Sequence, residues 1–133
     1  MGKHISMKNN FFGWVEIPVA DMNRAIKFYD FVFGFQLSQQ QFGDQCMAWF
    51  PNSSNENARG AGGSLVLHED YIPSVEGTLA YISVPSGDVS EELRNVEIAG
   101  GKVLLTKTLI GEGLGYMALI LDSEGNKIAL HND

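Results

Sequence analysis

The stretch from Phe11 to Leu37 constrains the fold of this chain more than any other. It reads FFGWVEIPVADMNRAIKFYDFVFGFQL, an alternating strand at 14–19 that leads directly into a helix. Apolar residues recur in the helix at the spacing of a single helical face, and they are Met22, Ala25, Ile26, Tyr29 and Phe33. Asp21 is predicted to cap the start of this helix, and Gly34 to end it. We expect the preceding strand to face the functional site.

The same order of elements recurs in the second half of the chain. Three further strands follow the first helix, at 35–42, 45–50 and 62–69. The second unit has strands at 79–84, 102–106, 116–121 and 127–131. Its helix begins at Asp88, and Glu91 has the capping-box spacing from it. The glycine-rich stretch 108–115 reads as a flexible lid or turn, because neither a P-loop lysine nor a following helix accompanies it. The order βαβββ therefore occurs twice.

This repeat predicts an α+β fold of two tandem βαβββ modules that form a curved, half-open mixed sheet around a concave cavity. The division we expect is a flexible N-terminal segment at 1–10, a first module at 11–70, a linker at 71–78 and a second module at 79–133, all within one domain. The first ten residues are polar and read in part as an expression tag, with Met7 as an alternative start.

Composition narrows the class of protein. The chain has 133 residues, 44% of them hydrophobic, which is typical of a globular domain. Its net charge of −7 argues against nucleic acid and anionic membranes as partners. The single cysteine, Cys46, indicates a reducing compartment, and it is expected to be buried and inert. No apolar run approaches the ~18 residues of a membrane span, so we expect a cytoplasmic protein.

Three segments carry a resemblance to a known family. They are VADMNRAIKFYDFVFGF at 19–35, AGGKV at 99–103 and LDSEGNKIAL at 121–130. With them the chain resembles the vicinal oxygen chelate (VOC) superfamily, which includes glyoxalase I, extradiol dioxygenases, and fosfomycin and bleomycin resistance proteins. The resemblance covers nearly the whole chain from Phe11 onward. It implies the fold but no single reaction, because such folds carry several chemistries.

Enzymes of that superfamily hold a divalent metal with four side chains, usually His or Glu, on four strands. The resemblance places those four positions at Trp14, at Gly63 or Ser64, at Leu79 and at Ala129. Only serine among these offers a donor atom, and it is a poor ligand for such a metal. We therefore expect a glyoxalase-like branch without the usual ligands, with no metal and no other cofactor.

The two-residue period of strands predicts what lines the cavity instead. The expected ligand-binding residues are Trp14, Glu16, Leu79, Tyr81, Ala129 and His131. Glu16 is the candidate catalytic residue, either as a base with a raised pKa or as an anchor for a cation. Four of these residues have a structural alternative: Trp14 and Tyr81 as packing, Glu16 as a partner of Arg24, and His131 as a solvated side chain. His68 reads as part of an exposed acidic loop.

Three functions are compatible with these residues. The first is a metal-free protein that binds a small cationic or aromatic molecule, as the likeness to bleomycin resistance proteins implies. The second is a glyoxalase-like lyase or isomerase, or a dioxygenase, with a divalent metal at relocated ligands or Glu16 as general base. The third is an accessory module with a vestigial site. We also expect a homodimer, because the resemblance implies one and because open sheets leave edges that need cover.

Overall fold

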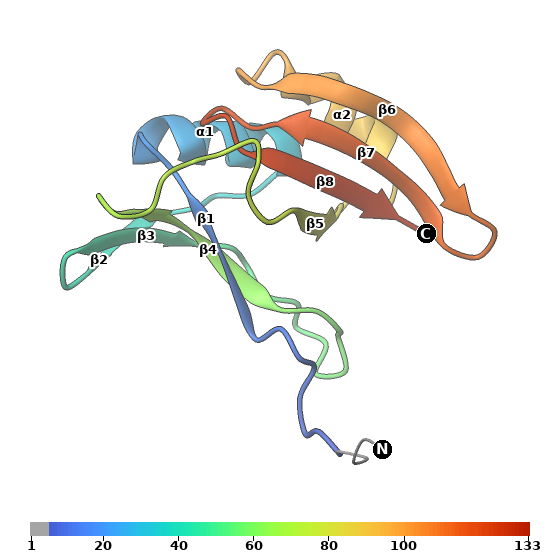
Figure 1. The fold of residues 1–133 in the computed structure, drawn as a ribbon, viewed down its shortest axis with the longest axis horizontal. Helices are drawn as coiled ribbons and strands as arrows, with labels where there is room; N and C mark the ends of the chain where they lie inside the picture. Colours follow the sequence, from blue (N-terminus) through green and yellow to red (C-terminus); the bar gives the residue numbers. More distant parts are fainter. Residues whose placement is uncertain (1–5) are drawn as a thin grey trace.

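The computed structural model describes residues 6–133 and has eight strands and two helices there (Figure 1). The first module contains β1 (Trp14–Pro18), α1 (Met22–Phe33), β2 (Gln39–Phe42), β3 (Gln45–Trp49) and β4 (Gly62–Leu67). The second contains β5 (Ala80–Ser83), α2 (Val89–Val96), β6 (Lys102–Gly111), β7 (Gly115–Leu121) and β8 (Lys127–Asn132). The predicted α+β fold with two βαβββ units is confirmed. Of the predicted flexible segment 1–10, residues 1–5 lie outside the described residues.

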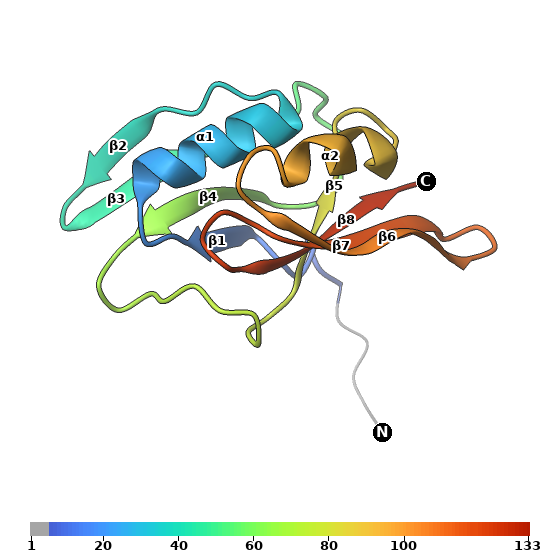
Figure 2. The same ribbon diagram turned by 90° about the horizontal axis from the view of Figure 1, so that it is seen from above.

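The strands form two four-stranded mixed sheets, in the orders β1-β4-β3-β2 and β5-β8-β7-β6. In each sheet one pair is parallel, β1 with β4 and β5 with β8, and the other pairs are antiparallel. Figure 2 shows α1 and α2 side by side over the same side of the two sheets. We call the opposite side the helix-free face. It is the side on which a ligand would meet the strands directly.

The core lies between the helices and the sheets, because each element turns an apolar face toward that layer. From α1 it takes Met22, Ala25, Phe28, Tyr29, Val32 and Phe33, all buried. From the strands beneath, Ile17, Ala48 and Leu65 are Cα partners across three strands and belong to the same cluster. Leu130, Ala118 and Ile120 make the corresponding layer in the second module.

Both predicted ends of α1 are confirmed. The carboxylate of Asp21 accepts a hydrogen bond from the Arg24 backbone N–H at 3.1 Å, and Gly34 adopts a left-handed conformation with φ of 78°. Asp88 caps α2 as predicted and accepts from the Ser90 N–H at 3.0 Å. The predicted capping box is wrong, because the Glu91 side chain pairs with Arg94 at 3.2 Å instead of reaching back.

Two predicted boundaries also need correction. The second strand begins at Gln39, not at residue 35, because Phe35 and Leu37 leave the sheet to pack against the core. A hydrogen bond of 2.9 Å from the Leu37 N–H to the Asp30 carboxylate holds that segment against α1. The stretch 108–115 contains the predicted turn at 112–114 but is no free lid, because β6 extends to Gly111 and pairs with β7 in an irregular register.

The turn between β7 and β8 joins the second module to the first. One oxygen of the Glu124 carboxylate accepts the backbone N–H groups of Ala20 and Asp21, both at 2.9 Å, ahead of α1. Two nitrogens of the Arg24 side chain donate hydrogen bonds to the same carboxylate, at 2.8 and 2.9 Å. Burial raises the pKa of Glu124, but the hydrogen bonds from Arg24, Asp21, Ser123 and Ala20 outweigh it and lower this pKa to about 2. The carboxylate is therefore held ionised.

Buried hydrogen bonds continue this junction into the core. The Tyr29 hydroxyl donates to the Asp122 carboxylate at 2.7 Å, and the Asn126 amide donates to the Pro18 carbonyl at 2.7 Å. Burial and then the neighbouring Asp122 charge raise the pKa of Tyr29 well above its ordinary value, so the hydroxyl stays a donor. Both contacts fix β1 and α1 against the second sheet.

Among residues 6–133, no helix has the length and apolarity to cross a membrane.

Candidate functional site

The helix-free face of the first sheet brings together side chains from three strands. Glu16, Ser64 and Trp49 are Cα partners across β1, β4 and β3, and Trp14 is paired with Gly62 at the next position on this face. Paired residues point to the same side of a sheet, and successive residues alternate. Since the neighbours Ile17, Leu65 and Ala48 point into the core, these four side chains point away from the helices.

Three aromatic rings form a continuous row on this face. The rings of Trp14 and Trp49 meet edge to face at 5.3 Å, and those of Trp49 and Phe42 stack at 5.7 Å. We call Trp14, Trp49 and Phe42 the aromatic row. These side chains are 42%, 48% and 44% exposed, respectively. Gly62 makes room for the row, because a Cβ at this glycine would lie 3.1 Å from the Trp14 indole. Large exposed rings in contact are a surface that planar molecules can stack on.

Two polar side chains accompany the row. Glu16 is exposed, and among residues 6–133 its carboxylate makes no ion pair. Arg24, the partner considered from the sequence, binds Glu124 instead. Ser64 is fully buried, and its hydroxyl oxygen has no hydrogen-bond partner within the described part of the chain. Buried hydroxyls usually have a partner, so this one keeps an unused donor and acceptor.

The remaining predicted residues gather in the second sheet. Tyr81 and Ala129 are Cα partners, and His131 lies two residues further along β8 on the same face. Tyr81 is 55% exposed, and among residues 6–133 its hydroxyl has one hydrogen-bond partner, the Met117 sulfur at 4.0 Å. Ala129 is fully buried, and the half-buried His131 ring contacts the Leu114 carbonyl at 2.8 Å through Nε2. Leu79 lies just before β5 and is 38% exposed.

The structure therefore divides the predicted site residues between two sheets. Trp14 and Glu16 stand with the aromatic row on the first, whereas Tyr81, Ala129 and His131 stand on the second. The sequence reasoning did not include Trp49, Phe42 or Ser64 as binding residues. Alternation along 45–50 already predicts that Trp49 points to the side of the sheet away from the core residue Ala48. Only the strand register shows that Trp49 contacts Trp14.

The residues at the four expected metal positions do not fit a divalent ion. The Trp14 indole only donates, and Leu79 and Ala129 carry no donor atom for a metal. No side chain fits at Gly63, because a Cβ there would lie 2.5 Å from the Val15 carbonyl oxygen. Nor does any group of three or more His, Cys, Asp or Glu side chains in residues 6–133 have an arrangement that could hold a metal ion. His68 lies 3.5 Å from Asp44 and 3.9 Å from Asp70, so its acidic surroundings are as predicted, but its side chain is only 14% exposed.

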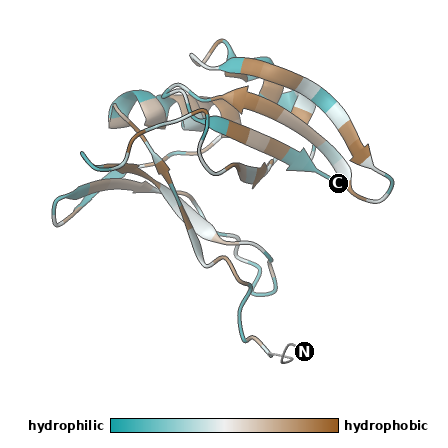
Figure 3. Cartoon of the chain, viewed as in Figure 1, coloured by the Kyte–Doolittle hydropathy of each residue, from teal (hydrophilic) through white to brown (hydrophobic). Residues whose placement is uncertain are grey.

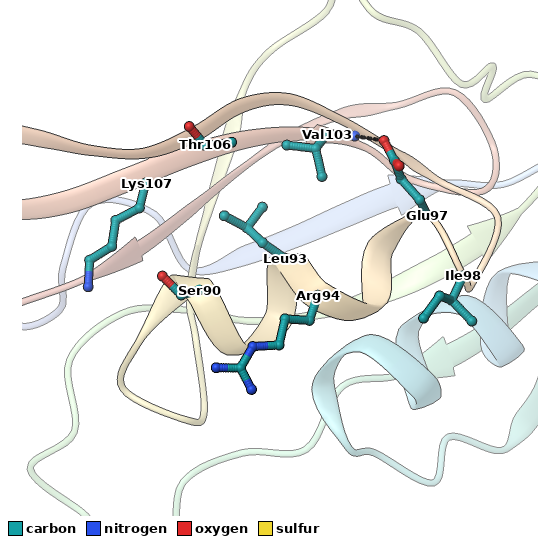
Figure 4. Close-up of a pocket in the computed structure, with 8 residues that line it drawn as sticks. All are labelled: Ser90, Leu93, Arg94, Glu97, Ile98, Val103, Thr106 and Lys107. Carbon is teal, nitrogen blue, oxygen red and sulfur yellow. Dashed lines mark hydrogen bonds between the residues drawn. The ribbon is translucent and has the colours of Figure 1, made fainter.

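A separate hollow of about 650 Å³ lies between α2 and β6, on the helix side of the second sheet (Figure 4). Its charged side chains already have partners. Lys107 binds the Asp88 carboxylate at 3.0 Å, and Arg94 binds Glu91 at 3.2 Å. Glu97 accepts from the Val103 backbone N–H at 3.5 Å. With its charges paired internally, this hollow offers a ligand less than the aromatic row does.

Comparison with solved structures supports the fold. A glyoxalase/bleomycin resistance protein from Albidiferax ferrireducens T118 has a TM-score of 0.66 at 16% identity, over 93% of this chain and 99% of that protein. TnmS3, an antibiotic binding protein from Streptomyces sp. CB03234, has a TM-score of 0.60 at 21% identity, over 96% of this chain and 98% of its own. Glyoxalase I from Zea mays has a TM-score of 0.62 at 21% identity, over 90% of this chain and 44% of the enzyme.

This chain thus spans less than half the length of the Zea mays enzyme. No sequence among curated proteins matches it. The family model described as the Glyoxalase/Bleomycin resistance protein/Dioxygenase superfamily matches residues 11–130, which include both βαβββ modules. On the strength of this match, together with the shared fold, the chain belongs to the glyoxalase/bleomycin resistance protein/dioxygenase superfamily.

Proposed function

We propose that this protein binds a small organic molecule on its helix-free face and does so without a catalytic metal. The observation that carries the proposal is Trp14. At the position where the superfamily's enzymes are expected to place their first metal ligand, this chain has a 42% exposed indole in contact with a second one. An indole cannot coordinate a divalent cation, but it is a large flat contact surface.

Two further observations support binding over a vestigial site. The aromatic row exposes three large rings next to each other, and such patches commonly mark interaction sites. A structural relative of nearly the same length, TnmS3, is described as an antibiotic binding protein. Glu16 favours one alternative, a metal-free lyase or isomerase, because a carboxylate that makes no ion pair within residues 6–133 and lies beside a binding surface is placed to act as a general base.

We further propose that the protein is a cytoplasmic homodimer. Cys46 is a buried free thiol, which suits a reducing compartment. The outer strand β6 is ten residues long, and Leu104, Leu105, Leu109 and Ile110 on it are exposed. Figure 3 shows the hydrophobic colouring of β6. A long apolar edge strand needs cover, and a second copy of the chain supplies it. Sedimentation at micromolar concentration tests this: a monomer would refute it.

Two measurements on the purified protein test the binding proposal. Elemental analysis after dialysis is expected to find no stoichiometric divalent metal. A thermal-shift screen of small aromatic and cationic compounds is expected to yield a ligand that raises the melting temperature by about 10 °C when present at 100 times its Kd. That shift should be lost in Trp14→Ala and kept in a Phe31→Ala control on the far side of α1. A tightly held metal, or no stabilising compound in the screen, would overturn the proposal.

A further inference from the structure

We propose that the aromatic row and Glu16 form a subsite for a flat aromatic cation, such as a ring system with a positively charged ring nitrogen. The proposal rests on the proposed binding function and specifies the class of molecule and the sheet that holds it. It assigns the ligand's rings to Trp14, Trp49 and Phe42, and its charge to the Glu16 carboxylate.

The shape of the surface selects flat ligands. Trp49 stacks with Phe42 at an interplanar angle of 17°, whereas Trp14 stands at 69° to Trp49. The two parallel rings and the upright one therefore form a corner rather than a plane. A fused aromatic ring can stack on the exposed rings and present its edge to the third, which are the two geometries that aromatic pairs prefer.

The charge of the surface selects cations. The faces of indole and benzene rings carry partial negative charge, so a cation above them is attracted, and tryptophan is the strongest of these. Glu16 lies two residues from Trp14 on the same face of β1. In the sheet, Ser64 is paired with Glu16 on one side and with Trp49 on the other. Its exposed carboxylate has no ion-pair partner among residues 6–133. An anionic aromatic molecule would instead be repelled by this side chain.

Ser64 adds a polar contact beneath the rings. It stands between Glu16 and Trp49 in the sheet, it is fully buried, and its hydroxyl oxygen is unpartnered in the part of the chain that the structure describes. A buried polar group without a partner costs free energy that a hydrogen-bonding ligand recovers. We therefore assign the Ser64 hydroxyl to a polar atom on the edge of a ligand that enters between Glu16 and Trp49.

The test uses a matched pair of probes on the full chain. 1-Methylquinolinium is a flat aromatic cation, and 1-methylnaphthalene is its neutral analogue of the same shape. The chain has two tryptophans, Trp14 and Trp49, so the two indole N–H signals in a proton–nitrogen NMR spectrum both report on this site. Both signals are expected to shift with saturation, and the cation should bind about 3- to 30-fold more tightly than the neutral probe.

Variants separate the contribution of the Glu16 charge to probe binding from that of the Trp49 ring. Glu16→Gln should remove most of the advantage of the cation and leave the affinity for 1-methylnaphthalene within about 2-fold. Trp49→Leu should weaken the binding of both probes by at least about 10-fold. Trp49→Phe, which keeps an aromatic ring, should retain most of the wild-type affinity. Glu112→Gln and Phe31→Leu change exposed side chains of the same types elsewhere and should alter neither affinity.

Three binding results would overturn the subsite. They are equal binding of the two probes, equal binding by wild type and Glu16→Gln, or no saturable shift of either indole signal. A wild-type dimer that Trp49→Leu converts to a monomer would also overturn it, because the row would then contact a second copy. If a compound from the thermal-shift screen still stabilises Trp49→Leu, the protein binds small molecules elsewhere. In that case this subsite fails and the broader function stands.

Discussion

The Glu124→Gln substitution tests whether the turn between β7 and β8 holds the two modules together. In the wild type the two carboxylate oxygens accept two backbone N–H groups, two Arg24 nitrogens and the Ser123 hydroxyl. Glutamine keeps the size of this side chain, but it has no charge and only one accepting oxygen. Its amide nitrogen would face groups that are themselves donors. The substitution therefore removes charge-assisted hydrogen bonds without leaving a cavity.

The pKa of the carboxyl gives the size of the effect. It falls from an ordinary value of 4.5 to about 2 in the folded protein, and each pH unit corresponds to 1.36 kcal/mol. The full difference is about 3 kcal/mol. Arg24 is half-exposed, with 53% of its side chain accessible, so water screens that part of the attraction. We expect Glu124→Gln to lower the free energy of unfolding by about 2–3 kcal/mol at pH 7.

The dependence on pH has a definite direction. Because the folded pKa of Glu124 lies below its unfolded value, the stabilisation is fully present above pH 4.5 and is lost as pH falls toward 2. Urea unfolding followed by circular dichroism at pH 7 and pH 3 measures this directly. The penalty of Glu124→Gln should shrink to less than half between the two pH values. A penalty below about 0.5 kcal/mol at pH 7, or one unchanged at pH 3, would refute the reasoning.

A matched control is available in α2. Glu91 also pairs with an arginine, Arg94 at 3.2 Å, but the two side chains are 50% and 70% exposed. Glu91→Gln should change the free energy of unfolding by less than about 0.5 kcal/mol at either pH. Comparison of the two substitutions separates the loss of a carboxylate as such from the loss of the junction between modules.

Three further substitutions follow from the same contacts, each read out by urea unfolding at pH 7. Gly101→Ala should destabilise by about 1–3 kcal/mol, because a Cβ there would lie 2.4 Å from the Leu121 carbonyl oxygen, and a wild-type midpoint would contradict this. Tyr29→Phe should cost about 1–3 kcal/mol, since it removes one donor from the buried Asp122 carboxylate, which keeps N–H groups of Glu124 and Asn126; no change would show that these N–H groups satisfy it. Ser64→Ala should be neutral or stabilising, and a loss above about 1 kcal/mol would reveal a missed partner for that hydroxyl.

Local patterns were sufficient where the physical cause is local. The apolar stripe, Asp21 and Gly34 predict α1 to the residue, because capping and helical periodicity involve atoms within one or two turns. The same local reasoning failed at residues 35–38, which alternate like a strand but pack Phe35 and Leu37 into the core. It also ended the strand that begins at Lys102 too early, at residue 106. Pairing with β7 continues β6 to Gly111 across several irregularities in register.

The candidate site divides in the same way. Alternation along β1 predicts that Trp14 and Glu16 share a face, and the structure places them together on the helix-free side. It gives no information on which residues of other strands lie beside them. Trp49 and Phe42 join Trp14 through the register of β1, β4, β3 and β2, which depends on contacts between residues far apart in the chain.

The sequence alone thus determined the repeated βαβββ order and the α1 caps, because each depends on residue type and short spacing. The metal positions came from the family resemblance, and the residue types at them are read directly from the sequence. Only the tertiary structure decided that the Glu124 carboxylate accepts a hydrogen bond from the Asp21 N–H at the start of α1. These two residues are 103 positions apart in the chain. The tertiary structure likewise decided that three rings from three strands form one exposed row. Both are consequences of strand register and module packing, which bring distant residues together in ways that no local pattern records.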